Sequence, residues 1–117
     1  MSTTEVKIAI PLADGKLCMH FGHCERFALI NVDQDAKKIT GREDLVPPAH
    51  EPGVLPRWLA EQGATVILAG GMGQRAQELF TQQNIHVMVG VPSETPETLV
   101  SQYLAGNLQS GNNVCDH

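Results

Sequence analysis

The sequence has few basic residues, few aromatic residues and no long apolar run. Only 8 of its 117 residues are lysine or arginine, these are scattered, and the formal net charge is −5. Because proteins that bind nucleic acids usually present a basic patch to the phosphates, we expect no nucleic-acid partner. The longest apolar runs are far too short to cross a membrane, and the segment MSTTEVKIAI does not have the pattern of a signal peptide. We therefore expect a cytoplasmic protein with no membrane partner.

Cysteine is also scarce, since the chain contains only three. In a reducing compartment these residues should be thiols or metal ligands and not a disulfide framework. Apolar residues make up 42% of the sequence and charged residues 18%, which is typical of a globular protein. A chain of 117 residues can bury a core without covalent cross-links. We expect one domain, residues 1–117, that is a monomer.

Short apolar segments alternate with segments of helical periodicity in the second half of the chain. The pattern predicts the order β-β-β-α-β-α-β-α, with a loop from Leu12 to about Glu25. Glycine after the first and last helices, and proline in the first turn of the last, support those boundaries. The predicted strands are 6–11, 27–32, 38–44, 65–69 and 85–89, and the predicted helices are 55–62, 74–83 and 95–105.

This order predicts an α/β fold with one mixed five-stranded sheet and helices on its faces. The first, fourth and fifth strands should be parallel, and the second should be antiparallel to them. Ligands of open α/β sheets gather at the carboxyl ends of the parallel strands. The loops that follow these strands should therefore converge on one crevice.

The first of these loops contains the segment CMHFGHC, residues 18–24. Thiolates and imidazoles are ligands of soft and borderline metals, although this spacing matches no closed zinc finger. Alternatively, Gly22 allows a tight turn, Phe21 packs into the core and the polar residues are solvated. A catalytic cysteine with a histidine base is a further alternative, without a recognised nucleophile signature. Together with CDH at 115–117, the candidate metal ligands are Cys18, His20, His23, Cys24, Cys115 and His117.

The segment GGMGQRA, residues 70–76, follows the fourth predicted strand and opens a helix. It fits a dinucleotide fingerprint from Gly71 to Ala76, but that motif belongs after the first strand of a larger fold. A more general interpretation is that glycine backbone, a helix N-terminus and Arg75 attract an anion. Alternatively, the glycines only let the helix pack closely on the sheet.

Four segments resemble one known family over nearly the whole chain. They are KIAIP at 7–11, HFGHCERFALINVD at 20–33 and LAEQGATVILAGGMGQRAQELFTQQNIHVMVG at 59–90, followed by YLAGNL at 103–108. Together they resemble the dinitrogenase iron–molybdenum cofactor-binding family, which includes nitrogenase cofactor carriers and small single-domain relatives such as the orange proteins. The resemblance implies a ribonuclease H-like motif. It also implies a protein that binds or carries an anionic metal–sulfur cluster, of molybdenum–copper sulfide or iron–molybdenum type, and is not an enzyme.

The resemblance also implies a set of cluster-binding residues. His20 and the turn Gly71–Arg75, which includes Met72 and Gly73, would line the pocket, while Gly22 provides a turn and Phe21 anchors the loop. Thiolates would suit copper or iron in the cluster, and a cluster donor or acceptor protein would be the partner. Two alternatives stay open: a regulatory or interaction module of the same fold without a cluster, and a simple zinc- or iron-binding protein. A two-metal nuclease is not expected, because the fourth strand carries no carboxylate.

Overall fold

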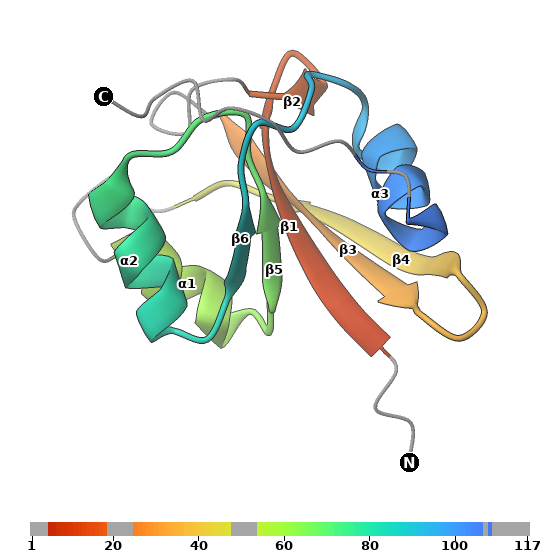
Figure 1. The fold of residues 1–117 in the computed structure, drawn as a ribbon, viewed down its shortest axis with the longest axis horizontal. Helices are drawn as coiled ribbons and strands as arrows, with labels where there is room; N and C mark the ends of the chain where they lie inside the picture. Colours follow the sequence, from red (N-terminus) through yellow and green to blue (C-terminus); the bar gives the residue numbers. More distant parts are fainter. Residues whose placement is uncertain (1–4, 19–24, 48–53, 107, 109–117) are drawn as a thin grey trace.

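The computed structural model describes residues 5–18, 25–47, 54–106 and 108. Within these ranges the chain forms a mixed α/β fold (Figure 1). No helix among the described residues is long and apolar enough to cross a membrane. The elements are β1 (Glu5–Ala13), β2 (Lys16–Leu17), β3 (Arg26–Asp33), β4 (Lys38–Leu45), α1 (Val54–Glu61), β5 (Val66–Leu68), α2 (Gln74–Gln82), β6 (His86–Met88) and α3 (Pro96–Ala105).

The strands form one mixed sheet in the order β4-β3-β1-β5-β6, and β2 pairs with the end of β1. β1, β5 and β6 are parallel, whereas β3 is antiparallel to both β1 and β4. The predicted mixed sheet is therefore confirmed. Because β3 is antiparallel to both of its neighbours, β4 runs in the same direction as β1. The carboxyl end of β4 therefore lies at the same edge of the sheet as the carboxyl ends of β1, β5 and β6.

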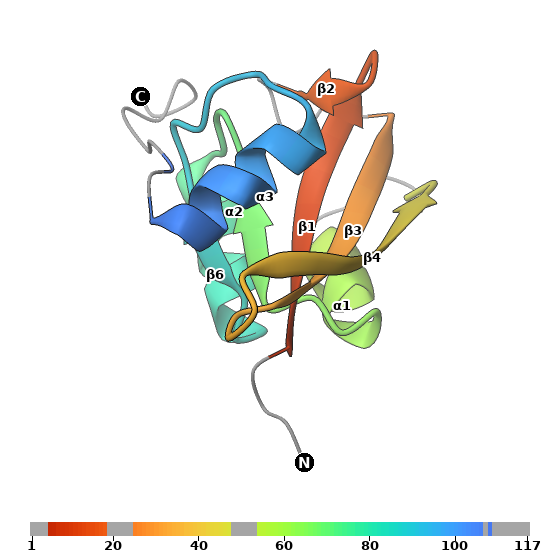
Figure 2. The same ribbon diagram turned by 90° about the vertical axis from the view of Figure 1, so that its right-hand side faces the viewer.

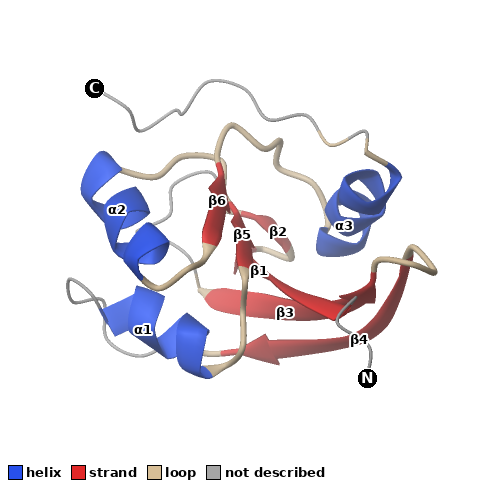
Figure 3. Cartoon of the chain, turned by 60° about the horizontal axis from the view of Figure 1, so that its bottom comes forward, coloured by secondary structure: helices blue, strands red, loops and turns tan. Residues whose placement is uncertain are grey.

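Helices cover both faces of the sheet: α1 and α2 lie on one face and α3 on the other (Figure 3). The side chains of β1 alternate between the two faces, as a strand requires. Ala9 belongs to a core cluster with Leu59 of α1 and Phe80 of α2. Ile8 and Ile10 belong to a second cluster with Leu99 and Val100 of α3. Figure 2 shows α3 lying across this second face.

The structure differs from the sequence prediction after Pro11. β1 does not end at this proline but continues to Ala13 and turns back into β2. Asp14 and Gly15 form the turn with φ angles of 56° and 80°, the left-handed backbone that a two-residue hairpin needs. The prediction of a loop from Leu12 was therefore wrong, because the Asp-Gly pair forms a two-residue hairpin turn and β1 continues past Pro11 to reach it. β2 carries the chain to Cys18 in extended conformation.

The helix ends agree closely with the sequence. Gly63 follows α1 with a φ of 91°, and Gly106 follows α3 with a φ of 78°. Both are left-handed positions that glycine adopts without the steric cost of a Cβ. Pro96 is the first residue of α3, where its missing N–H costs no helical hydrogen bond. α1 begins and ends one residue earlier than predicted.

Candidate functional site

The loops that follow β5 and β6 adjoin at the carboxyl edge of the sheet. The Ala69 N–H donates to the Met88 carbonyl over 2.8 Å, and the Gly90 N–H donates to the Gly70 carbonyl over 2.9 Å. The Val91 N–H then donates to the Ala69 carbonyl over 3.1 Å. Backbone hydrogen bonds thus continue beyond the strands, and the glycine turn that precedes α2 is held against the turn that follows β6.

The hairpin of β1 and β2 is attached to the same edge by the loop that precedes α3. The Leu17 N–H donates to the Glu94 carbonyl over 3.0 Å, and the Ser93 hydroxyl donates to the Leu17 carbonyl over 2.8 Å. Three loops that are far apart in the sequence therefore meet at one edge, as the sequence predicted. The two bonds from Ser93 and Glu94 were not predicted, because no local pattern indicates a partner 76 residues away.

The segment 19–24 begins and ends beside consecutive residues of β1. The Cys18 N–H donates to the Pro11 carbonyl over 2.8 Å, and the Glu25 N–H donates to the Leu12 carbonyl over 2.7 Å. The chain therefore leaves and re-enters the sheet at its carboxyl edge. The predicted site residues His20, Phe21, Gly22, His23, Cys24, Cys115 and His117 lie outside the described residues.

The N-terminus of α2 lies at this edge and has the features of an anion site. Gly73 is its N-cap, with a φ of −62°, and has no side chain to cap the first amides. A Cβ at Gly73 would meet no atom within 4 Å, so the space beside these amides is open. The first turn contains no acidic residue, and Arg75 in that turn is exposed. Backbone N–H groups, the helix dipole and a guanidinium therefore all favour negative charge at this point.

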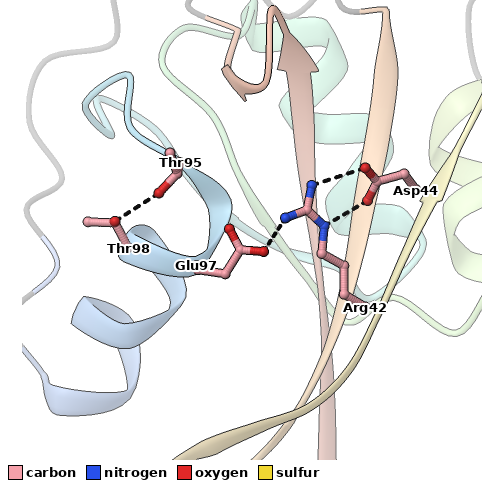
Figure 4. Close-up of polar contacts among 5 residues, drawn as sticks. All are labelled: Arg42, Asp44, Thr95, Glu97 and Thr98. Atoms are coloured by element: carbon pink, nitrogen blue, oxygen red, sulfur yellow. Dashed lines mark hydrogen bonds and ion pairs between the residues drawn. The ribbon is translucent and has the colours of Figure 1, made fainter.

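The first turn of α3 is different in charge. It contains Glu97, and its N-cap Thr95 shares a hydroxyl–hydroxyl bond of 2.8 Å with Thr98 (Figure 4). The Glu97 carboxylate already occupies the favourable end of this helix dipole. Of these two helix N-termini, that of α2 is therefore the better site for an anion from solution.

Arg42 joins the first turn of α3 to the sheet. Arg42 of β4 binds Asp44 with Nε–Oδ1 and Nη2–Oδ2 distances of 2.8 and 3.0 Å, and also contacts Glu97 (Figure 4). The hydrogen bond from Arg42 lowers the pKa of the Asp44 carboxyl and the pKa of the Glu97 carboxyl below their ordinary values. The guanidinium pKa is raised in turn, chiefly by Asp44. The ion pairs fix the start of α3 relative to β4.

Two predicted site residues with sulfur side chains are buried beneath the edge. Cys18 is 8% exposed and Met72 is 1% exposed, and both belong to the core cluster that packs under α1 and α2. The backbone of Met72 is also fixed, because the Gln77 side-chain amide donates to its carbonyl over 2.9 Å. Met72 therefore contributes packing and turn geometry. Gly71 is buried as well, whereas Gly73 and Arg75 are exposed, and the role of these residues in binding a cluster stays a prediction.

The described residues do not by themselves form a metal centre. No group of three or more histidine, cysteine or acidic side chains in the described ranges lies close enough together to hold a metal ion. Cys18 is the one predicted metal ligand within those ranges. The metal-ligand set proposed from the sequence thus stays a prediction.

These features define a small α/β protein with an anion-favouring edge, and comparison with known proteins assigns its family. The family model described as dinitrogenase iron–molybdenum cofactor matches residues 4–106. The chain belongs to this family.

Individual proteins are similar to this chain over most of its length. An uncharacterised protein of Methanocaldococcus jannaschii is 28% identical over 109 residues, which cover 89% of this chain and 90% of the relative. The crystal structure of PH0822 is 27% identical, covers 90% of this chain and 94% of its own, and superposes with a TM-score of 0.81. The apo form of the orange protein from Desulfovibrio gigas is 24% identical over 92% of this chain and 93% of its own, with a TM-score of 0.69. This last likeness supports the fold alone.

Proposed function

We propose that the protein binds and carries an anionic metal–sulfur cluster at the carboxyl edge of its parallel strands. The observation that carries this proposal is the N-terminus of α2. Its amides have no side-chain cap, its first turn has no acid, and the space beside Gly73 is open. Membership of the dinitrogenase iron–molybdenum cofactor family supports cluster binding in general. The likeness to the apo form of the orange protein does not identify the metal.

The chemistry of the edge suits such a cargo. Clusters of molybdenum–copper sulfide or iron–molybdenum type are anions with sulfur atoms on their surface, and these accept hydrogen bonds. The exposed glycine at 73 allows the neighbouring backbone N–H groups to approach a bulky ligand closely, since no Cβ intervenes, whereas Gly71 is buried and would shape the turn. Arg75 adds a cation, and charge-assisted hydrogen bonds are the stronger kind.

The cysteines and histidines of the two flanking segments would complete this site. We assign His20 as the principal contact from the segment 19–24, with Phe21 and Gly22 shaping that segment. Cys18 and Cys24 are proposed thiolate ligands, with His23 beside them. The tail would add Cys115 and His117. Thiolates bind copper and iron more readily than molybdate-type oxygen ligands do, so these residues favour a cluster that contains one of those metals.

In this account the protein holds its cargo and does not transform it. The partner is a protein that donates the cluster or accepts it. A reversible carrier suits a site at an exposed sheet edge, where hydrogen bonds and charge supply much of the affinity. An interaction module of the same fold would differ from a cluster carrier in one measurable property, since it would take up no metal.

Anaerobic reconstitution tests the proposal. The apo-protein would be incubated with tetrathiomolybdate and Cu(I), in parallel with Fe(II) and sulfide, and with Zn(II) alone. After gel filtration, metal and sulfide per chain and the visible spectrum would be measured. We expect stoichiometric metal with sulfide and a visible absorption band in at least one cluster condition. Uptake of zinc alone would support a simple metal-binding protein, and no uptake at all would support the interaction module.

A further inference from the structure

The peptide bond between Leu17 and Cys18 is held from both sides. Its carbonyl, on Leu17, accepts the Ser93 hydroxyl over 2.8 Å, and its N–H, on Cys18, donates to Pro11 over 2.8 Å. Both polar atoms of one rigid peptide plane are therefore bound, one to the loop before α3 and one to β1. The Leu17 N–H is bound as well, to the Glu94 carbonyl.

These bonds differ in what a mutation can remove. The contacts with Pro11 and Glu94 use backbone atoms, which substitution at those positions leaves in place. The contact with Ser93 uses a side-chain hydroxyl on an exposed loop residue. Ser93 is therefore the one side chain in this arrangement whose chemistry determines how firmly the Leu17–Cys18 peptide is held.

The consequence concerns the Cys18 thiol. Cys18 is only 8% exposed in this conformation, so a reagent or a metal reaches its sulfur through a local opening of the edge. An opening that moves Leu17 away from the loop breaks the Ser93 bond. A net hydrogen bond is worth about 1 kcal/mol, so its loss should make such openings about fivefold more frequent.

We propose that Ser93 is a positioning residue that holds the Leu17–Cys18 peptide at the rim of the cluster site and thereby sets how long a cluster is retained. The effect on cluster retention rests on the proposed function. The hydrogen bond that positions the Leu17–Cys18 peptide is a property of the protein without a cluster. Ser93 would act through Leu17 and would not touch the cluster.

Two measurements test this inference on the full chain. In a background with Cys24→Ser and Cys115→Ser, Cys18 is the sole thiol, and its alkylation rate under native conditions reports the local opening. The variants are Ser93→Ala, which removes the hydroxyl, Ser93→Thr, which keeps it, and Ser101→Ala, a matched change on an exposed position of α3. We expect alkylation about fivefold faster in Ser93→Ala, and close to the parent rate in the other two.

The second measurement uses the native cysteines and a reconstituted tetrathiomolybdate–copper cluster. Its dissociation rate should rise severalfold in Ser93→Ala and be restored in Ser93→Thr. Equal alkylation rates in Ser93→Ala and the parent would overturn the positioning role. Faster alkylation with unchanged cluster dissociation would overturn its role in retention. If the parent takes up no cluster, the proposed function fails, whereas the alkylation rates still decide whether Ser93 holds Cys18.

Discussion

Arg42 on β4 binds Glu97 in the first turn of α3, although 55 residues separate them in the sequence. The same guanidinium binds Asp44 through two hydrogen bonds. One side chain thereby joins an edge strand to the helix whose preceding loop holds Leu17. The ion pairs and the hydrogen bonds of Ser93 and Glu94 fasten this loop region at both of its ends.

The Arg42–Glu97 pair should make stability depend on pH in the acid range. The pKa of Glu97 is lowered in the folded protein, so its contribution is present above its ordinary value of 4.5 and is lost as the pH falls through the lower folded pKa. The Glu97 side chain is 52% exposed, and an exposed pair contributes about 0.5 kcal/mol. Urea unfolding of Glu97→Gln should therefore show a small loss of stability at pH 7 that shrinks below pH 4.5.

Glu43→Gln is the matched control, because Glu43 lies next to Arg42 on β4 and forms no ion pair with another described residue. It should change stability less than Glu97→Gln at neutral pH. An undiminished difference between Glu97→Gln and the parent at strongly acidic pH would show that the ion pair is not the cause.

Substitution of Gly73 should separate the stability of the apo-protein from affinity for an anion. The N-cap backbone and the open space beside it can accept Asp or Asn, and either should raise the free energy of unfolding by a few tenths of a kcal/mol, since glycine is a slightly weaker cap. Gly73→Asp also places a negative charge where the anion should bind. We therefore expect Gly73→Asp to weaken cluster binding about fivefold or more, and Gly73→Asn to weaken it less. Equal affinities for the two variants would contradict an anion site.

Removal of the Arg75 charge should weaken binding in a salt-dependent way. An exposed cation near an anionic cluster contributes about 0.5–1 kcal/mol, so Arg75→Ala should lower affinity about two- to fivefold at low salt. The difference should shrink at high salt, where screening weakens the interaction. Arg57→Ala, which removes an exposed charge from α1, is the control and should leave affinity close to that of the parent. If the two variants behave alike, Arg75 is a surface charge without a role in binding.

Two substitutions at Cys18 distinguish a ligand from a core residue. Cys18→Ala keeps an apolar side chain in the cluster that contains Met72, whereas Cys18→Ser introduces a hydroxyl there and should destabilise the protein by about 1–2 kcal/mol. If the thiolate is a ligand, both variants lose metal or shift the charge-transfer absorption. If both reconstitute with the parent spectrum, Cys18 serves only the core.

Much of the fold could be predicted because it depends on local patterns. The apolar segment Val66–Ala69 indicated a buried parallel strand, and the glycines at 63 and 106 marked helix ends where the backbone is left-handed. The exception was the hairpin at Asp14 and Gly15, because the proline before it also has the pattern of a strand end. The ribonuclease H-like assignment within this fold class stays a prediction.

The site was less predictable than the fold. Gly71–Arg75 could be found because a glycine-rich turn before a helix has a local sequence pattern. Ser93 could not be predicted, because its contact with Leu17 depends on how the loop after β6 meets the hairpin of β1 and β2. The burial of Cys18 was also hidden, because Leu17 and Met19 flank it and no alternation of apolar and polar residues assigns its side chain to a face.

Whether a cluster binds at the start of α2 is tested most directly by finding which backbone amides it affects. Backbone amide NMR spectra of the apo-protein would be compared with those of protein loaded with tetrathiomolybdate and Cu(I), which form a diamagnetic cluster. We predict that the largest changes in amide chemical shift fall on Gly71, Gly73, Gln74 and Arg75. The amide signals of Lys37 and Gly63, at the opposite edge of the sheet, should stay unchanged. Stoichiometric cluster binding with the largest shifts at the opposite edge, or with none at the start of α2, would contradict this prediction.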